Sequence, residues 1–329
     1  MTLLSLAGIL PPCPRAASHS GACESAALPG TAAAGGPGRG VPSPREIVRP
    51  LARRTACSLE QFEVSTLLVP IQQIATFATD PFRGNPAFVV TLDAPLPATV
   101  LHRLCRHLNE TMVAVLAPEN NGFSLHFVTP TGFHPGAGHA THAAAWVALK
   151  TLRPGEASLD LHLQSGGYRS IRAEGDLISV DWPAMPYASA DMLAPLEDAL
   201  GVRPLETFSS SFGAIAVFDR SETIAGLTPD LGKVSKLPSD TVIVTAPSTA
   251  ADFAIRVFAP KLGLPEDPVC GTAHRILAPL WAGRTGRRML VSHQLSERGG
   301  ELFCELRGET VTISGRATSF LTGSIALPS

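Results

Sequence analysis

The sequence predicts an α+β protein made of two similar halves, and three observations lead to this fold class. Apolar segments with strand character alternate with segments of helical spacing from residue 69 to the end of the chain. HPGAGHATH at 134–142 aligns without a gap with DPVCGTAHR at 267–275, at a constant offset of 133 residues. Around both, a strand ending in proline leads to a glycine-bearing loop, a second proline and a helix that begins at glycine. This shared order of elements predicts a structural repeat.

The elements of the first half follow from hydrophobic periodicity and turn residues. The spacing of ATVLHRLCRHLNE predicts a helix over 98–110, and alanine-rich GHATHAAAWVALKTL predicts another over 138–152. The stretch DPFRGNP at 80–86 has the composition of a turn. Strands are expected over 69–79, 86–92, 111–118 and 123–130, with three short ones within 159–183.

The second half follows a segment, PAMPYASADML at 183–193, whose composition is typical of a linker. GLPEDPVCGTAHRILAPLW at 263–281 predicts a helix, and ELFCELRGETVTISGRATSF at 301–320 predicts a hairpin-rich end. Further strands are expected over 214–219, 240–246 and 253–260. The expected organisation is a leader over 1–66, an N-terminal domain over 67–185 and a C-terminal domain over 186–329.

The leader differs in composition from the rest of the chain. AALPGTAAAGGPGRGVPSPR is rich in Ala, Gly and Pro and holds almost no large apolar residue, so we expect disorder. LLSLAGIL near the start has the apolar character of a signal peptide. No Lys or Arg precedes it and PPCPR follows at once, which argues against export.

Bulk composition excludes several classes of function. An apolar content of 45% supports a core of ordinary size. A net charge of −2 without a basic block argues against nucleic acid as a partner. No apolar run approaches the ~18 residues of a membrane-spanning helix. The six cysteines are scattered, and half lie in the leader, so we expect a reducing, cytoplasmic compartment.

Gly138 and Gly271 are the first residues of the two predicted helices that correspond to each other in the repeat. A glycine at a helix start lets an anion approach bare backbone N–H groups at the positive end of the helix dipole. Each glycine alone is explained as well by a tight turn. Because titratable residues flank both, the pair favours a site that holds a small carboxylate from two sides.

Three titratable residues are candidates for the chemistry. Asp267 precedes Pro268, which favours extended backbone ahead of the helix, and the alternative is a helix-capping carboxylate. His139 is either a proton donor or a packed histidine. Glu110 lies between apolar flanks, so burial would raise the pKa of its carboxyl and suit it to proton transfer; an exposed helix-end glutamate is the alternative.

Cys270 and the histidines suggest other mechanisms, which the spacing disfavours. A two-thiol racemase needs a second cysteine, but Ala137 occupies the position that aligns with Cys270 in the repeat. GAGHAT has Thr141 where the dinucleotide fingerprint needs a third glycine or alanine. The histidines lack the spacing of a zinc site, so no metal is expected.

From Val69 to about Ile325 the chain resembles the PhzF family of phenazine-biosynthesis isomerases. The resemblance rests on FATDPFRGNPAFVV, LNETMVAVL, FVTPTGFHPGAGHATHAAA, IRVFAPKLGLPEDPVCGTAHRILAPLWA and SHQLSERGGEL, in this order. It implies a diaminopimelate-epimerase-like fold, in which each half wraps a barrel-like sheet around a central helix and the active site lies in the cleft between the two domains. It also implies no metal or organic cofactor, and usually a homodimer.

The resemblance also assigns roles to residues. Glu110 matches the glutamate that shuttles the proton, while His139, Asp267 and Thr272 match residues that orient the substrate. The other matches, all substrate-binding, are Asn85, Asn109, Gly138 and Gly271. Threonine replaces the usual serine at 272, asparagine the common serine at 109, and Phe133-His134 an often-found Glu-Val.

The resemblance thus implies a cofactor-independent isomerase that moves a proton between carbons of a small, cyclic or unsaturated carboxylate. In the best-known member of the family the substrate is a dihydro-hydroxyanthranilate, and the resemblance does not extend that substrate to this chain. Neither nucleic acid nor a membrane is expected as a partner. A Cys270-dependent epimerase and a non-catalytic binding protein stay open as alternatives.

Overall fold

The structure is a computed structural model that describes residues 66–328. The expected leader over 1–66 falls outside these residues, except for Thr66, which opens the first strand. Strand and helix segments mix throughout the described chain, as the predicted α+β class requires.

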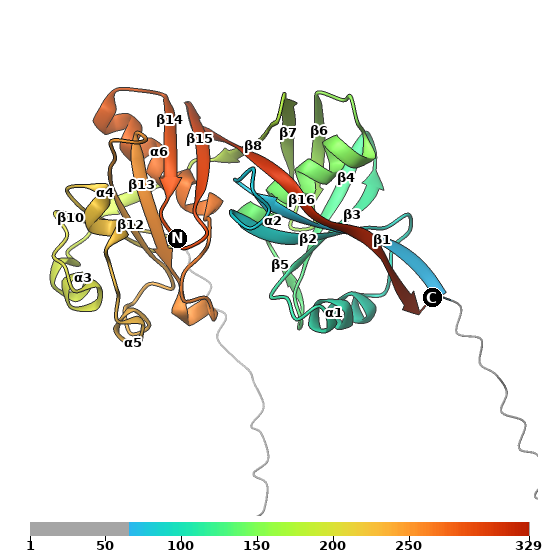
Figure 1. The fold of residues 1–329 in the computed structure, drawn as a ribbon, viewed down its shortest axis with the longest axis horizontal. Coiled ribbons are helices and arrows are strands. Elements are labelled where there is room, and N and C mark those ends of the chain that lie inside the picture. Colours follow the sequence, from blue (N-terminus) through green and yellow to red (C-terminus); the bar gives the residue numbers. More distant parts are fainter. Residues whose placement is uncertain (1–65, 329) are drawn as a thin grey trace, which may run out of the picture. The chain divides into compact units, whose positions relative to one another are not determined.

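An eight-stranded closed barrel forms the first half (Figure 1). The strands pair in the order β1-β2-β3-β4-β6-β7-β8-β16, and β16 pairs with β1 to close the ring. Seven of them come from the first half, but β16 comes from the C-terminal end of the chain. They are β1 (Thr66–Thr76), β2 (Asn85–Thr91), β3 (Val113–Glu119), β4 (Gly122–Val128), β6 (Ser158–Leu163), β7 (Tyr168–Glu174), β8 (Leu177–Pro183) and β16 (Thr310–Pro328).

Helix α2 (Gly138–Val147) packs inside this barrel, against β1, β2, β3, β4 and β8. Its alanines are small enough for backbone and sheet to approach closely, and Ala143, Ala144 and Ala145 are fully buried. A π-helical turn (Ala148–Leu152) follows. The short strand β5 (Phe133–His134) pairs with β4, and α1 (Ala98–His107) packs outside, burying Leu101, Leu104 and Cys105.

The second half continues the same sheet from β16 in the order β15-β14-β13-β12-β11-β10-β9 and does not close. Helix α6 (Gly271–Thr285) packs against β14, β15 and β16. Its strands are β9 (Tyr187–Ser189), β10 (Glu206–Ser210), β11 (Ala214–Val217), β12 (Val242–Pro247), β13 (Phe253–Phe258), β14 (Met289–Gln294) and β15 (Gly300–Arg307). The remaining helices are α3 (Leu193–Leu200), α4 (Ser221–Ala225) and α5 (Leu231–Val234), with a 3₁₀ turn at Pro260–Leu262.

The pairing pattern confirms the predicted repeat. From β1 to β8 successive ladders run antiparallel, parallel, antiparallel, parallel, antiparallel, antiparallel. From β10 to β16 the same series recurs. Helices α2 and α6 occupy the corresponding crossovers, between β4 and β6 and between β13 and β14.

Several boundaries differ from the prediction, each for a local reason. The helix expected over 263–281 begins only at Gly271 and continues to Thr285. Pro265 and Pro268 lack an N–H and disfavour helical backbone before them, which explains the late start. The expected linker contains a short strand, β9. The prediction also missed β5, β10, β14, α3, α4 and α5.

Pro279 fixes the linker to α6. Having no N–H, it leaves the carbonyl of Arg275, four residues earlier, without its helical donor. The N–H of Met185 binds that carbonyl at 3.0 Å.

The described residues belong to one compact unit, joined across β8, β16 and β15. The expected boundary between residues 185 and 186 stays a prediction.

No helix in the described part of the chain is both long and apolar enough to cross a membrane. Among residues 66–328, Cys105, Cys270 and Cys304 are buried and form no disulfide.

Candidate functional site

The starts of helices α2 and α6 meet. A Cβ placed on Gly138 would lie 3.1 Å from the backbone nitrogen of Thr272 and 3.3 Å from the Cα of Gly271. A Cβ on Gly271 would in turn lie 3.6 Å from the Cα of Gly138. The backbones therefore touch, and the positive ends of both helix dipoles converge on one place.

Asn85 joins Asp267 to the first half of the chain. Asn85 begins β2, and its Nδ2 donates to Oδ1 of Asp267 and to the carbonyl of Val269, both at 2.9 Å. The side chain is only 6% exposed, so the hydrogen bonds fix the orientation of the Asp267 carboxyl in a protected place. Residues 182 positions apart thus form one cluster.

His139 and Asp267 perturb each other's protonation. Burial raises the pKa of Asp267, against the electrostatic effect of His139 and a hydrogen bond from the Cys270 thiol. Burial lowers the pKa of His139, and the negative charge of Asp267 opposes that shift. Burial thus favours the uncharged form of both groups, the protonated carboxyl of Asp267 and the neutral ring of His139.

Gln294 holds the loop that carries Asp267, and sequence reasoning assigned it no role. Its Oε1 accepts the N–H of Cys270 at 2.7 Å, and its Nε2 donates to the carbonyl of Asp267 at 2.6 Å. Ser296 donates to the carbonyl of Pro268 at 2.5 Å. The only sequence signal was the motif SHQLSERGGEL, which includes both residues.

The buried side chain of His274 connects the start of α6 to strand β14. Its Nδ1 contacts the carbonyl of Cys270 at 2.8 Å, and its Nε2 contacts the Ser292 hydroxyl at 2.9 Å. Thr272, in the first turn of α6, is half-buried. Within residues 66–328 its hydroxyl forms no hydrogen bond.

Glu110 and Asn109 lie at the C-terminal end of α1. Asn109 has φ +57°, a left-handed conformation that asparagine tolerates better than serine. Glu110 is half-buried, and this burial raises the pKa of its carboxyl. Its backbone is tied to Cys105, whose carbonyl accepts the Glu110 N–H at 3.2 Å.

Strand direction places Glu110 at the barrel end that carries the other candidates. Strands β2 and β3 are parallel, so Asn85 at the start of β2 and Glu110 just before β3 lie at the same end. Strand β4, antiparallel to β3, finishes at that end and leads to Gly138. Within the described chain no hydrogen bond or ion pair joins Glu110 directly to His139 or Asp267.

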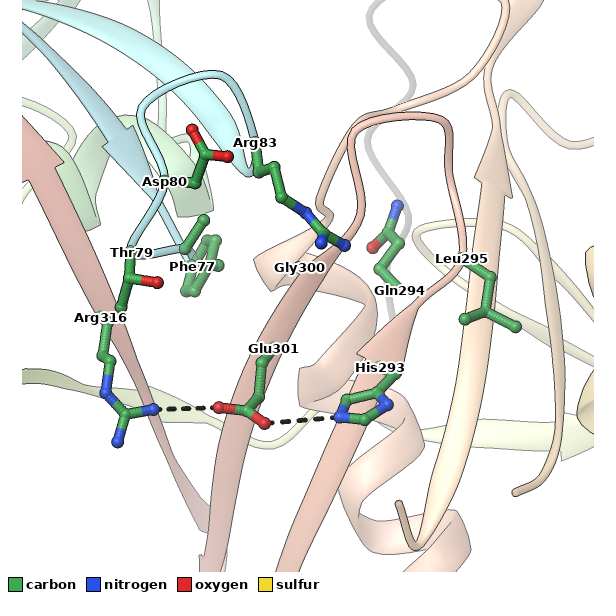
Figure 2. A pocket seen from close by; sticks show the side chains of 11 residues that line it. Phe77, Thr79, Asp80, Arg83, His293, Gln294, Leu295, Gly300, Glu301 and Arg316 are labelled. Atoms are coloured by element: carbon green, nitrogen blue, oxygen red, sulfur yellow. Dashed lines mark hydrogen bonds and ion pairs between the residues drawn. The ribbon is translucent and has the colours of Figure 1, made fainter. Parts of the chain in front are cut away.

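A cavity of about 420 Å³ adjoins the Asp267 loop but contains none of the candidate residues in its lining. Figure 2 shows Gln294 on its wall, and a chain in which Arg316 binds Glu301 at 3.0 Å and Glu301 lies 3.4 Å from His293. The geometry and chemistry of the converging helix starts, rather than this cavity, define the candidate site.

Metal chemistry was not expected. In the described part of the chain no group of three His, Cys, Asp or Glu side chains is arranged to hold a metal ion. His142 contacts the carbonyl of Gly315 at 3.1 Å, and His134 accepts the N–H of Gly136, so these rings have local partners.

Comparisons with known proteins agree with this architecture. An uncharacterized isomerase of Pseudomonas aeruginosa is 38% identical over 260 residues, covering 78% of this chain and 98% of that protein. A phenazine biosynthesis protein of the PhzF family from Enterococcus faecalis, a solved structure, has a TM-score of 0.76 at 33% identity, over 79% of this chain and 99% of that one.

A predicted epimerase from Pseudomonas aeruginosa shares the fold alone, with a TM-score of 0.58 at 19% identity, over 78% of this chain and 99% of that one. The family model for phenazine biosynthesis-like proteins, PhzC-PhzF, matches residues 74–323. This match covers most of the chain and agrees with the repeated strand pattern around α2 and α6, so the chain belongs to the PhzC-PhzF family.

Proposed function

We propose that this protein is a cofactor-independent isomerase that moves a proton between two carbons of a small, cyclic or unsaturated carboxylate. The proposal rests above all on the contact between the two helix starts beside the Asn85–Asp267 hydrogen bond. Free N–H groups at Gly138 and Gly271 suit a carboxylate or an enolate-like oxygen. Its relatives include proteins named as isomerases, which supports the same class of reaction.

Glu110 takes the proton from one carbon and returns it to another. A carboxyl whose pKa is raised by burial is a stronger base than an exposed one, and still gives up its proton easily near neutral pH. His139, Asp267 and Thr272 orient the substrate and stabilise the charge that shifts along its conjugated bonds. Asn85, Asn109, Gly138 and Gly271 complete the binding site, and the protein acts as a homodimer in a reducing compartment.

Solvent proton exchange tests this role of Glu110. Small cyclic and unsaturated carboxylates are incubated with the protein in D₂O, and deuterium incorporation is followed by NMR. We expect Glu110→Gln to lower the exchange rate by at least about 100-fold, because general base catalysis typically contributes that much. Glu119→Gln, at an exposed end of β3, is the matched control and should leave the rate unchanged. Equal rates in Glu110→Gln and the parent would overturn the proposal.

The Cys270-dependent epimerase is the less favoured alternative. Burial raises the pKa of the Cys270 thiol far above its ordinary value, with the Asp267 charge acting in the same direction, so the thiolate is scarce. Cys270→Ala reproduces the residue at the aligned position, Ala137. We expect it to retain exchange activity, whereas a thiol mechanism requires that activity to vanish.

A non-catalytic binding protein is the alternative from another class. It would keep the helix starts and Asp267 but would not need a buried base. In that case Glu110→Gln would bind the same carboxylates as the parent, and neither protein would exchange deuterium. Measuring binding and exchange on the same samples separates the two functions.

A further inference from the structure

Two arginines contact one tryptophan at the junction of the two halves. The guanidinium carbon of Arg169, at the start of β7, lies 4.9 Å from the ring centre of Trp182. That of Arg275, in α6, lies 5.4 Å from the same ring. Trp182, near the end of β8, is only 7% exposed. The ring therefore brings two like charges close together in partly buried surroundings.

Neither arginine has a carboxylate partner within residues 66–328. Nη1 of Arg169 donates to the carbonyl of Tyr168, and Nε of Arg275 donates to the carbonyl of Pro183. The Nε of Arg169 is the one buried side-chain nitrogen or oxygen without a hydrogen bond in the described chain. Burying an unpaired hydrogen-bond donor on a cation is unfavourable. A hydrogen-bond acceptor bound beside Nε of Arg169 would remove this cost.

The electrostatics agree with the geometry. Burial lowers the pKa of Arg169. Burial also lowers the pKa of Arg275, and repulsion from Arg169 lowers it further. An anion beside both groups would relieve the desolvation and the repulsion together.

The internal repeat shows that the fold does not require these charges. At the offset of 133 residues, Arg275 corresponds to His142 and Trp182 to Gly315. In the first half, His142 anchors the neighbouring strand through the Gly315 carbonyl at 3.1 Å, and burial lowers its pKa to about 4, so it is uncharged. Arg275 anchors the equivalent strand through Pro183 but adds terminal nitrogens that bind nothing described.

We propose that Arg169 and Arg275, positioned on Trp182, form a binding site for a small oxyanion, either a carboxylate or a phosphate or sulfate group. Planar guanidinium groups offer paired N–H donors that match two oxygens of such a group. Arg275 lies one turn after Gly271, about 6 Å along the helix axis. The oxyanion site uses none of the residues assigned to the candidate catalytic site.

Anion binding to the purified full-length protein tests this assignment. Sulfate, phosphate and malonate are titrated at low millimolar concentration by calorimetry and by thermal unfolding, against sodium chloride at equal ionic strength. Arg169→Met keeps the apolar contact with Trp182, and Arg275→His places in α6 the residue of the first half. We expect both variants to weaken anion binding about tenfold or more, as the loss of a charge-assisted hydrogen-bonding group predicts.

Arg153→Met is the matched control, because Arg153 also contacts an aromatic ring, that of Phe123, but pairs with Glu156. It should bind anions like the parent, and it corrects for general salt effects of sulfate. In anion-free buffer, Arg169→Met should be at least as stable as the parent, because the unpaired nitrogen and the repulsion are gone.

The site is supported if both variants lose the binding of malonate, or of sulfate and phosphate. Loss of malonate binding identifies a carboxylate as the ligand, and loss of sulfate and phosphate binding identifies an inorganic oxyanion or a phosphate ester. The proposal is overturned if no oxyanion binds the parent beyond the chloride effect, or if Arg169→Met and Arg275→His bind as the parent does. Because the readout is binding, failure here leaves the exchange test of Glu110 unaffected.

Discussion

At the scale of single residues, burial decides which groups carry protons. Burial raises the pKa of Glu110 and Asp267 and lowers the pKa of His139. The sequence could suggest Glu110 from its apolar flanks, and the alignment of residues 134–142 with 267–275 pointed to His139 and Asp267. It could not reveal Gln294, because a glutamine in a polar motif carries no sign that its amide bridges two backbone groups of another segment.

His142 and His274 should make the fold sensitive to acid. Burial lowers the pKa of both from 6.5 to about 4. A depressed pKa means that the stabilisation is complete above pH 6.5 and is lost as the pH falls toward 4. Each histidine should then cost roughly 3 kcal/mol of unfolding free energy near pH 4. Asp267 and Glu110, whose pKa values are raised, act in the opposite direction as the pH falls.

Urea unfolding between pH 7.5 and 4.5 measures this loss. His142→Gln keeps a donor for the Gly315 carbonyl and cannot gain a charge, so its stability should fall less steeply with acid than that of the parent. His107→Gln, at an exposed position of α1, is the control and should follow the parent. Parallel curves for His142→Gln and the parent would show that His142 is not the responsible group.

At the scale of elements, regular apolar periodicity was enough for most long segments. Strands β1 to β4, helices α1 and α2 and strands β11 to β13 appear near their predicted positions. Strand β14 was missed because Ser292 and Gln294 interrupt its apolar pattern although both are buried. Their partners, His274 and the Asp267 loop, lie elsewhere in the chain, and local sequence cannot report them.

The two glycines at the helix starts should respond differently to the same substitution. A Cβ on Gly138 meets backbone atoms at 3.1 and 3.3 Å, which forces the helices apart. We expect Gly138→Ala to lower the free energy of unfolding by about 1–2 kcal/mol, as overpacking does. A Cβ on Gly271 has its nearest neighbours at 3.5 and 3.6 Å, which is ordinary contact.

Gly271→Ala is therefore the matched control in the chemical denaturation experiment. It should be neutral, or stabilising by up to about 1 kcal/mol, because alanine favours helix more than glycine does. Equal destabilisation by both substitutions would contradict the close approach of the helix starts at Gly138.

At the scale of the whole molecule, one strand links the two halves. Strand β16 pairs with β15 and β8 along its first part and with β1 along the rest. The repeat could be predicted from residues 134–142 and 267–275. The closure of the first barrel by the far C-terminus could not, because no local pattern specifies a partner more than 200 residues away.

This topology predicts that the first half does not fold without β16. In a fragment of residues 1–185, β1 and β8 would each lose a strand partner, and the barrel around α2 would stand open with unpaired edges. We expect such a fragment to lack a cooperative thermal transition by circular dichroism, while the full chain unfolds cooperatively. Adding a peptide of residues 310–329 should restore part of the transition, and a peptide with the same composition in scrambled order should not. A fragment that unfolds cooperatively by itself would instead establish residues 67–185 as an independent domain, with β16 as a dispensable addition to it.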